Sequence, residues 1–521
     1  MVSNPIVKTD CPDPDVIRVD DTYYMVNTTM YFMPGCEILR SYDLANWEHV
    51  SYVYDTLDST PAQRLCDGES IYGQGMWAAS LRYNKGTYYI VFVANDTKKT
   101  YLYTSSSIEG PWKKSNIEGF YHDCSLLFDD DRVFIAYGNR EIYITELLND
   151  LSGPKPDGLH RMVVKDTDEA VLGYEGTHFY KINGKYYLFF IHSAEGYFFR
   201  KEACFVADSL EDEFKGQDIL IDDMEFPGMG IAQGPIVDTP DGKWYAILFQ
   251  DSGAVGRMPI LMPMHWENDF PVISEDKKAI RDFEVINSRP DYKYRPLVES
   301  DDFKGKSNDV IGTANSLKPC WQFNHEPDLE LLNHDLANGT VSITTDKLSA
   351  NVTQAKNTLT QRMMYPFCEG EIILDYSEIN EGDYAGLVAL QGAYAFVGVT
   401  KESGQYYVVM VERTLDDGTF NMRQKDCNPG KEVVRIPLTS EKDLSVNNKQ
   451  QIKLRISAVF EHMKDEASLF YDCGNGYEQI GHVHKMGFRL DHFTGVRFGL
   501  FIYSTKAAGG RATFANFRVN Y

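Results

Sequence analysis

The hydrophobic positions in the first 250 residues form short runs in which aromatic side chains lead into aliphatic ones. Most runs follow a turn rich in Asp, Asn, Gly or Lys, as Tyr186-Tyr187-Leu188-Phe189 follows Asn183-Gly184-Lys185, and such turns join the strands of β-hairpins. Successive runs lie 65, 45, 53 and 58 residues apart, beginning at Tyr23, Tyr88, Val133, Tyr186 and Trp244. A repeat of this length built from short strands predicts a five-bladed β-propeller.

One side chain about ten residues before each run occupies an equivalent place in the repeat. These side chains belong to Asp13, Trp77, Asp123, Glu175 and Gln233. Equivalent positions near the start of each blade are expected to converge at one end of the propeller axis, and three of the five carry carboxylates. Asp13 stands between two prolines that keep it out of a helix, although Asp before Pro is also an ordinary turn residue. Trp77 is either a platform under a sugar ring or a core residue.

The second half of the chain alternates apolar and polar residues in strands that follow one another without helices. This pattern predicts a two-sheet β-sandwich. A polar, proline-marked stretch separates it from the propeller repeats. We therefore predict an all-β chain with a propeller over residues 1–290, a linker over 291–300 and a sandwich of the jelly-roll, concanavalin-like type over 301–521.

Composition and charge narrow the class of partner. The 521 residues carry a net charge of −25, which argues against binding to nucleic acid or to anionic membranes. The sequence contains no run of 18 apolar residues, so no membrane span is predicted. A neutral partner fits better, and the 13% of aromatic residues either stack on sugars or pack within strands.

The cysteines and the first residues bear on the compartment. The nine cysteines are an odd number without a Cys-x-x-Cys motif, and Met1-Val2-Ser3-Asn4-Pro5 does not read as a secretory signal. Together they predict a cytoplasmic protein, or a secreted one if a signal has been trimmed away. Cys124 beside His122 raises the idea of a thiol nucleophile, but packing is the favoured interpretation.

Six segments resemble the motifs of glycoside hydrolase family 43 across about 275 residues. They are Pro12-Asp13-Pro14, Trp77-Ala78-x-Ser80-Leu81-Arg82-Tyr83, His122-Asp123-x-Ser125-Leu126, Glu175-Gly176, Gln233-Gly234-Pro235-Ile236-Val237-Asp238, and Gly256-Arg257 before Pro263-Met264-His265-Trp266. The resemblance implies a five-bladed propeller and an inverting hydrolase. It also implies that Asp13 is the general base, Glu175 the general acid, and Asp123 the residue that tunes pKa and orientation.

The chemistry of glycoside hydrolysis fits these roles. An inverting enzyme needs one carboxylate to activate water and one protonated carboxyl group to protonate the leaving oxygen, about 6.5–9.5 Å apart. Glu175 must then keep its proton near neutral pH, and a charged Asp123 nearby is expected to raise the pKa of Glu175. Arg257 is expected to hold Asp13 ionised and to donate hydrogen bonds to substrate hydroxyls.

One position departs from the family pattern. Gln233 stands where many members have a histidine that faces a central calcium ion or a water molecule. The Gln233 carbonyl oxygen could serve either, so an axial calcium or water near Gln233 stays open. The chemistry requires no cofactor, and calcium is not predicted to be catalytic.

The second domain resembles the concanavalin-like sandwich attached to β-xylosidases and α-L-arabinofuranosidases of this family. In that group the sandwich often lends a loop that closes the active site, and Asp491-His492-Phe493-Thr494-Gly495 is the candidate here. The apolar turn Met30–Met33 needs cover from a ligand, the sandwich or another subunit. Phe32 and Phe493 therefore join Trp77, Gln233 and Arg257 as predicted substrate-binding residues.

A wall over one side of the cleft favours release of single sugars from a chain end. We therefore expect an exo-acting β-D-xylosidase, with α-L-arabinofuranosidase activity as an unranked addition, acting on short xylo-oligosaccharides or arabinoxylan fragments. An endo- or exo-arabinanase and a carbohydrate-binding propeller without chemistry are the alternatives. A retaining fructosidase is disfavoured because its Asn-Asp-Pro and Arg-Asp-Pro motifs are missing. Homo-oligomerisation stays open.

Overall fold

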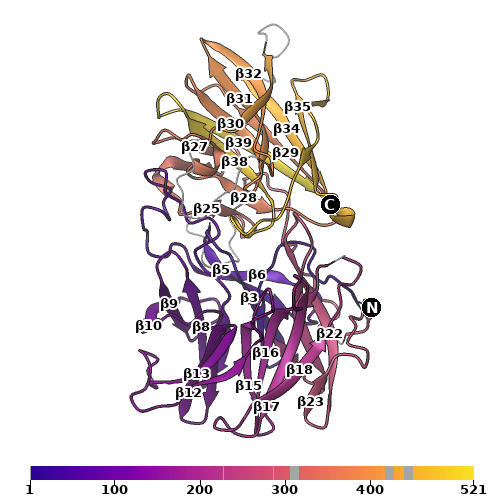
Figure 1. Ribbon diagram of the computed structural model, residues 1–521. Coiled ribbons are helices and arrows are strands. Elements are labelled where there is room, and N and C mark those ends of the chain that lie inside the picture. Colours follow the sequence, from indigo (N-terminus) through magenta and orange to yellow (C-terminus); the bar gives the residue numbers. More distant parts are fainter. Residues whose placement is uncertain (1, 227, 286, 306–315, 417–427, 439–449) are drawn as a thin grey trace.

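The computed structural model describes residues 2–226, 228–285, 287–305, 316–416, 428–438 and 450–521 (Figure 1). Within these ranges the secondary structure is almost entirely β. The helical segments described are three single 3₁₀ turns, Leu329–Leu331, Val352–Gln354 and Glu461–Met463, and none is long and apolar enough to cross a bilayer. The chain forms two β domains stacked on each other, as Figure 1 shows, and the predicted all-β class is confirmed.

The first domain is the predicted five-bladed propeller, and each blade is an antiparallel sheet. Blade 1 contains β2 (Asp15–Val19), β3 (Thr22–Asn27), β5 (Gly35–Ser41) and β6 (Glu48–Tyr54). Blade 2 contains β7 (Ser80–Asn84), β8 (Thr87–Ala94), β9 (Lys99–Ser105) and β10 (Lys113–Ile117). Blade 3 contains β11 (Ser125–Asp129), β12 (Arg132–Asn139), β13 (Glu141–Leu147) and β14 (His160–Lys165).

The last two blades follow the same plan. Blade 4 contains β15 (Glu175–Ile182), β16 (Lys185–Ser193), β17 (Arg200–Ala207) and β18 (Lys215–Leu220). Blade 5 contains β19 (Ile231–Ala232), β20 (Ile236–Asp238), β21 (Trp244–Asp251), β22 (Arg257–Glu267) and β23 (Phe270–Val272). The aromatic runs found in the sequence fall in the second strand of blades 1 to 4 and in β21, because these buried strands pack against neighbouring blades. A short pair, β1 (Val2–Ser3) with β24 (Asp282–Phe283), ends the propeller.

The second domain is the predicted sandwich of two antiparallel sheets. One sheet has the order β33 (Lys431–Pro437), β32 (Gln405–Glu412), β31 (Ala395–Glu402), β30 (Asp383–Leu390), β38 (Arg497–Ser504), β28 (Leu359–Arg362), β25 (Gln322–Asn324) and β4 (Phe32–Met33). The other has the order β26 (Leu332–Asp335), β27 (Thr340–Thr344), β39 (Arg511–Asn520), β29 (Phe367–Asp375), β34 (Gln451–Val459), β35 (Glu466–Asp472) and β36 (Glu478–Gln479), with β37 (His484–Lys485) also on β35.

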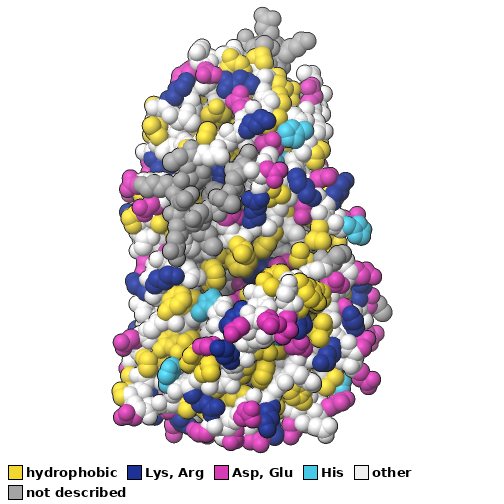
Figure 2. All heavy atoms as spheres, viewed as in Figure 1, with side chains coloured by type: hydrophobic (Ala, Val, Ile, Leu, Met, Phe, Trp, Pro, Cys, Tyr) yellow, Lys and Arg dark blue, Asp and Glu magenta, His cyan; other side chains and the backbone are white. Residues whose placement is uncertain are grey.

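Strand β4 belongs to the propeller chain but lies in the sandwich sheet. Met33 is paired with Phe323 and Phe32 with Asn324, so the apolar turn Met30–Met33 is buried beneath the sandwich. Of the covers considered for this turn, the structure therefore shows the sandwich. Figure 2 shows hydrophobic side chains gathered along this boundary between the two domains.

A buried ion pair also joins the domains. The Arg362 guanidinium on β28 donates to both Glu37 carboxylate oxygens on β5, at 2.9 and 2.7 Å. His49 lies 2.8 Å from the same carboxylate. Burial opposes the charge, but Arg362 and His49 outweigh it and hold the pKa of Glu37 well below its usual range. The contact between the two domains is thus both apolar and charged.

Candidate active site

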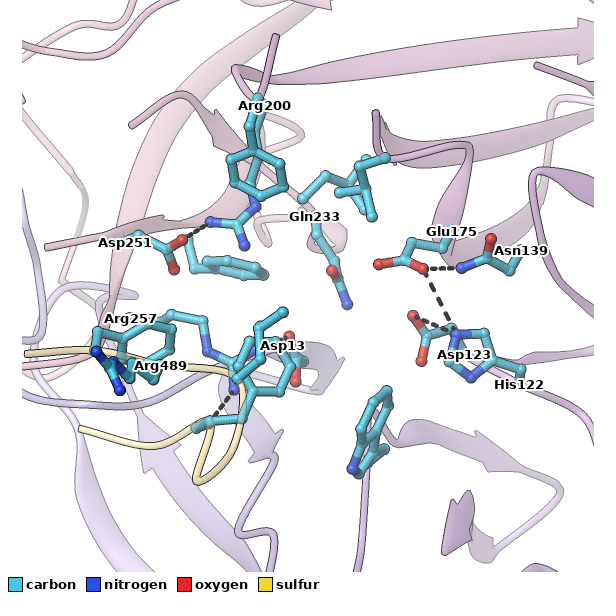
Figure 3. Close-up of a pocket in the computed structure, with 18 residues that line it drawn as sticks. Asp13, His122, Asp123, Asn139, Glu175, Arg200, Gln233, Asp251, Arg257 and Arg489 are labelled. Carbon is cyan, nitrogen blue, oxygen red and sulfur yellow. Dashed lines mark hydrogen bonds and ion pairs between the residues drawn. The ribbon is translucent and has the colours of Figure 1, made fainter. Parts of the chain in front are cut away.

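A pocket of about 570 Å³ lies where the blade starts face the sandwich (Figure 3). Its lining residues are Asp13, Trp77, His122, Asp123, Asn139, Leu172, Glu175, Ile191, Phe198, Arg200, Gln233, Phe249, Asp251, Arg257, Phe488, Arg489, Leu490 and Phe493. All five side chains from equivalent positions of the repeat are among them. The predicted convergence therefore occurs, and residues more than 100 positions apart in the sequence share one cavity.

The backbone at the blade starts is locally unusual. Asp13, Asp123 and Gln233 have φ angles of 49°, 48° and 58°, in the left-handed region that non-glycine residues seldom adopt. Two of them, Asp13 and Asp123, stand two residues before the first strand of their blade. Such conformations persist when surrounding structure fixes them, and they are common at functional sites. Here they turn polar side chains into the pocket just before the chain enters a buried strand.

Asp13, Arg257 and Phe493 form one wall of the pocket, hereafter the Asp13 side. The Arg257 guanidinium donates to Asp13 Oδ1 at 2.8 Å and to the Phe493 carbonyl oxygen at 3.2 Å. It also lies 4.3 Å from the centre of the Phe493 ring and 5.4 Å from that of Phe249. Arg257 is 2% exposed, so its charge is compensated chiefly by Asp13. The predicted pairing of these two residues is present, and a sandwich residue completes it.

His122, Asp123, Asn139 and Glu175 form the opposite wall, hereafter the Glu175 side (Figure 3). The Asn139 amide donates a short hydrogen bond to Glu175 Oε2. His122 Nε2 lies 3.6 Å from that oxygen and 3.7 Å from Asp123 Oδ2, which also accepts from the Gly176 N–H at 3.1 Å. Two carboxyl groups and an imidazole thus form one coupled cluster.

Burial is unequal within this cluster. The side chain of Asp123 is 7% exposed and that of Glu175 is 19% exposed. Burial, together with the charges of Glu175 and Asp13, raises the pKa of Asp123 to about 7, although the nearby His122 opposes the shift. Burial also opposes a charge on His122, but Asp123 and Glu175 outweigh it and raise the pKa of His122 to about 9.

The raised pKa of Asp123 differs from the sequence hypothesis in one respect, because that hypothesis treated Asp123 as the charged neighbour of Glu175. The main reason is that the Asp123 side chain is deeply buried, because burial disfavours the charged form of a carboxyl group and so raises its pKa. Asp123 and His122 therefore both bind a proton more readily than they would in water, and they lie beside the more exposed Glu175. Two groups with raised pKa values thus lie beside the Glu175 carboxyl group.

Gln233 lies between the two sides in Figure 3. Its backbone N–H donates to Glu202 at 2.7 Å. Among the described residues, one group of His, Cys, Asp and Glu side chains is compact enough to share an ion, and it is His122, Asp123 and Glu175 rather than a group around Gln233. That group offers an imidazole nitrogen and two carboxylates, which is not the oxygen cage of six to eight ligands that calcium takes. Of the two candidates left open for the axis, calcium or water, calcium gains no support from these side chains.

Two further predicted contacts have different outcomes. Trp77 lines the pocket, with its ring centre 5.8 Å from those of both His122 and Phe493. Phe32 does not line it and is only 1% exposed. Its ring packs under the Arg497 guanidinium, 3.4 Å from the ring centre, because β4 is drawn into the sandwich sheet. Phe32 is therefore part of the domain interface and supports the site from behind.

Several lining residues escaped the sequence analysis. Asn139 ends β12, and Arg200 and Asp251 form a buried ion pair from the start of β17 and the end of β21. For the ion pair, the one sequence signal was a pair of opposite charges, Arg200 at the start of one strand and Asp251 at the end of another. Phe488, Arg489 and Leu490 lie just before the predicted closing loop, so the sandwich contributes a longer segment than expected, from 488 to 493. His122 was visible in the His122-Asp123 motif but was considered only as a base for a thiol.

Carboxyl groups on opposite walls of a small pocket, one paired with arginine and the other beside two groups of raised pKa, fit the acid–base site of a glycosidase. The comparisons with known proteins agree. Residues 2–271 match Glycosyl hydrolases family 43, and residues 313–520 match the Beta xylosidase C-terminal Concanavalin A-like domain. The chain therefore belongs to glycoside hydrolase family 43, as its motifs indicated, and the relatives that it matches include proteins named beta-xylosidase and alpha-L-arabinofuranosidase.

The individual proteins that resemble this chain share between 23% and 38% of its residues in the three examples that follow. A beta-xylosidase from Formosa agariphila is 24% identical over 97% of this chain and 88% of its own length. A non-reducing end alpha-L-arabinofuranosidase from Bacteroides ovatus is 23% identical over 83% and 82%. A solved structure of a bifunctional protein of Bacteroides eggerthii, described as GH43-CE, has a TM-score of 0.88 and 38% identity over the whole of this chain. The chain spans 63% of that protein's length.

Proposed function

We propose that this enzyme is an exo-acting, inverting β-D-xylosidase that also accepts α-L-arabinofuranosides. The observation that carries the proposal is a pocket with a carboxylate on each wall, narrowed on one side by residues 488–493 of the sandwich. A cavity of about 570 Å³ falls in the range of small-molecule sites and suits a chain end rather than the middle of a long polymer. The names of the relatives, which include both activities, support the choice of sugars.

In the proposed mechanism the two walls act together. Asp13 accepts a proton from water as that water attacks the anomeric carbon, while Arg257 fixes the orientation of the carboxylate. Glu175 donates a proton to the departing glycosidic oxygen. Asn139 orients the Glu175 carboxyl group, and Asp123 and His122 keep protons beside it. Bond cleavage and attack occur on opposite faces of the sugar, which inverts the anomeric configuration.

No cofactor takes part in these steps. An axial calcium ion would have to use the Gln233 carbonyl oxygen together with water, and it would supply charge and rigidity at the base of the pocket rather than chemistry. Dialysis against a chelator with activity and thermal unfolding as readouts tests this. Loss of either, restored by calcium, would establish the ion.

The test of the proposed function is hydrolysis of p-nitrophenyl β-D-xylopyranoside, p-nitrophenyl α-L-arabinofuranoside and xylobiose. Proton NMR reads the anomer of the first-formed sugar. We expect turnover of at least the xyloside and xylobiose, with α-xylose formed first. Failure on all three substrates would reject the exo-pentosidase proposal and lead to linear arabinan, whereas β-xylose as first product would reject inversion and the assigned roles.

We propose separately that the protein is located in the cytoplasm. The eight described cysteines are all free thiols, which supports a reducing cytoplasm. Fractionation of the native cells with an antibody against this chain tests it, and recovery in the medium or envelope fraction would reject it.

A further inference from the structure

We propose that Asp10 is a positioning residue that ties the sandwich loop 491–496 to Arg257 and thereby holds the guanidinium against Asp13. The inference rests on the proposed function only in taking Asp13 as the base. Asp10 lies three residues before Asp13, outside the pocket, and is 4% exposed. Its carboxylate touches both domains.

Each oxygen of Asp10 has one backbone donor. The Arg257 N–H donates to Oδ1 at 2.8 Å, and the Gly495 N–H donates to Oδ2 at 2.8 Å. A carboxylate can accept both hydrogen bonds, whereas a carboxamide has one accepting oxygen and one donating nitrogen. The neutral, nearly isosteric Asn therefore cannot hold the propeller strand and the sandwich loop at the same time.

The two backbone segments that donate to Asp10 pack tightly around its side chain. Gly256 has φ 101°, and a Cβ atom there would lie 2.3 Å from Asp10 Oδ1. A Cβ atom on Gly495 would lie 2.2 Å from the Val255 carbonyl oxygen and 2.7 Å from Asp10 Cβ. Both positions therefore exclude side chains, and the two backbones approach the carboxylate directly.

The consequence reaches the pocket through Arg257. Asp10 fixes the Arg257 backbone, and Asp13 and the Phe493 carbonyl fix its guanidinium. Phe493 lies only two residues before Gly495, so the loop that Asp10 holds is the loop that contacts the guanidinium. Asp10 thus sets the distance between the sandwich loop and the base without touching the substrate.

The loop has other attachments, so loss of Asp10 should displace it rather than release it. The Tyr31 hydroxyl lies 2.9 Å from Thr494 Oγ1, and the Gln391 amide donates to the Thr494 carbonyl at 3.1 Å. The Val496 N–H also donates to the Ala254 carbonyl at 2.8 Å. A displacement of this kind changes catalysis more than folding, and small misplacements of catalytic groups are costly.

The experiment compares Asp10→Asn with Asp301→Asn in the full chain. Asp301 is a matched control because it is buried, lies in the sandwich away from the pocket, and likewise accepts two N–H bonds, from Phe303 and from Trp321, each at 2.9 Å. We expect Asp10→Asn to lower kcat/KM by about 10- to 100-fold, mostly through kcat, and to move the acid limb of the pH profile. Asp301→Asn should lower Tm and leave that limb in place.

Each result decides the matter. An Asp10→Asn enzyme with the wild-type acid limb and kcat/KM, or one that resembles Asp301→Asn in changing only Tm, would overturn the proposal. If Asp10→Asn does not fold, Gly495→Ala displaces the same loop, and an unchanged acid limb there would overturn it. Wild-type activity on the glycosides, measured alongside, reports separately on the proposed function.

Discussion

The Glu175 side of the pocket is built from the propeller alone, whereas the Asp13 side is shared between the propeller and the sandwich. On the Glu175 side, neighbouring blades bring together an imidazole and two carboxyl groups, and electrostatics sets their charge. On the Asp13 side, Arg257 is enclosed by Asp13, Phe249 and the sandwich residue Phe493, so geometry depends on how two domains meet. The pKa values on the Glu175 side are therefore set within one domain, whereas the positions of Asp13 and Arg257 depend on both domains.

The largest effects should come from the two carboxyl groups themselves, and they should differ with the leaving group. Asp13→Asn should lower kcat/KM by about 10²–10⁴-fold on both xylobiose and a nitrophenyl xyloside, because water attack is needed in each case. Glu175→Gln should lose a similar factor on xylobiose but far less on the nitrophenyl substrate, whose anion leaves with little acid help. Equal losses for the two variants on both substrates would contradict the division of roles.

The next effect concerns the domain contact behind the Asp13 side. Glu37→Gln leaves Arg362 buried without its counter-charge and should destabilise the protein by about 3–5 kcal/mol. Because Glu37 has a lowered pKa in the folded state, wild type should lose this stabilisation as the pH falls below about 4.5, and the variant should not. Denaturant unfolding at pH 7 and pH 4 measures both.

A partly exposed group of three charged residues on the sandwich serves as the control for Glu37. Arg435 contacts Glu402 and Glu432 near the surface, and removing its charge with Arg435→Gln should cost less than about 1 kcal/mol. If Glu37→Gln also lowered the free energy of unfolding by less than about 1 kcal/mol, the Glu37–Arg362 ion pair would not be a main source of stability at the domain contact.

A smaller effect is expected from the hydrogen bond on the Glu175 side. Asn139→Ala removes the amide that donates to Glu175 and should raise the barrier by about 1.5–3 kcal/mol, since the bond is made to an ionisable group. Steady-state kinetics on xylobiose should show this loss, while the nitrophenyl xyloside is little affected. Phe493→Leu, on the Asp13 side, should slow both substrates alike.

The smallest effect should be a shift in pH dependence. His122→Gln removes a cation, so the pKa of Asp123 should rise above about 7 and the alkaline limb of kcat/KM should move to higher pH, with only a few-fold change at the optimum. The raised pKa of His122 also stabilises the wild type below about pH 6.5, and that stabilisation is lost as the pH rises through about 9. A variant whose alkaline limb and stability profile match wild type would contradict this account.

Much of the Glu175 side could be predicted from sequence because a blade is a local unit. Each hairpin lies within a few residues of the polar side chain at its start, so the repeat itself indicated Asp123 and Glu175 on this side, as it did Asp13 and Gln233 elsewhere in the pocket. The raised pKa of Asp123 could not be predicted, because its main cause is the depth at which the Asp123 side chain is buried. Burial of this kind follows from the packing of blades and leaves no local pattern.

The Asp13 side was less accessible to such reasoning. Arg257 and Phe493 are 236 residues apart in the sequence but in contact in the structure. No local pattern around either residue indicates that the Gly495 N–H, in the loop that carries Phe493, donates to Asp10. Phe32 shows the opposite error: an apolar residue on a turn was interpreted as a substrate contact, but a sheet edge from the second domain covers it. Contacts between domains therefore limited the prediction more than contacts between blades.

The position of β4 at the edge of the sandwich sheet has a consequence for how the chain is assembled. Without β4, the outer edge of β25 would present unpaired backbone groups and invite pairing with other chains. During synthesis the segment containing Phe32 and Met33 leaves the ribosome almost 300 residues before β25, so the first blade can already be folded when the sandwich emerges. A folded propeller can then offer β4 as the edge strand with which the sandwich completes its sheet.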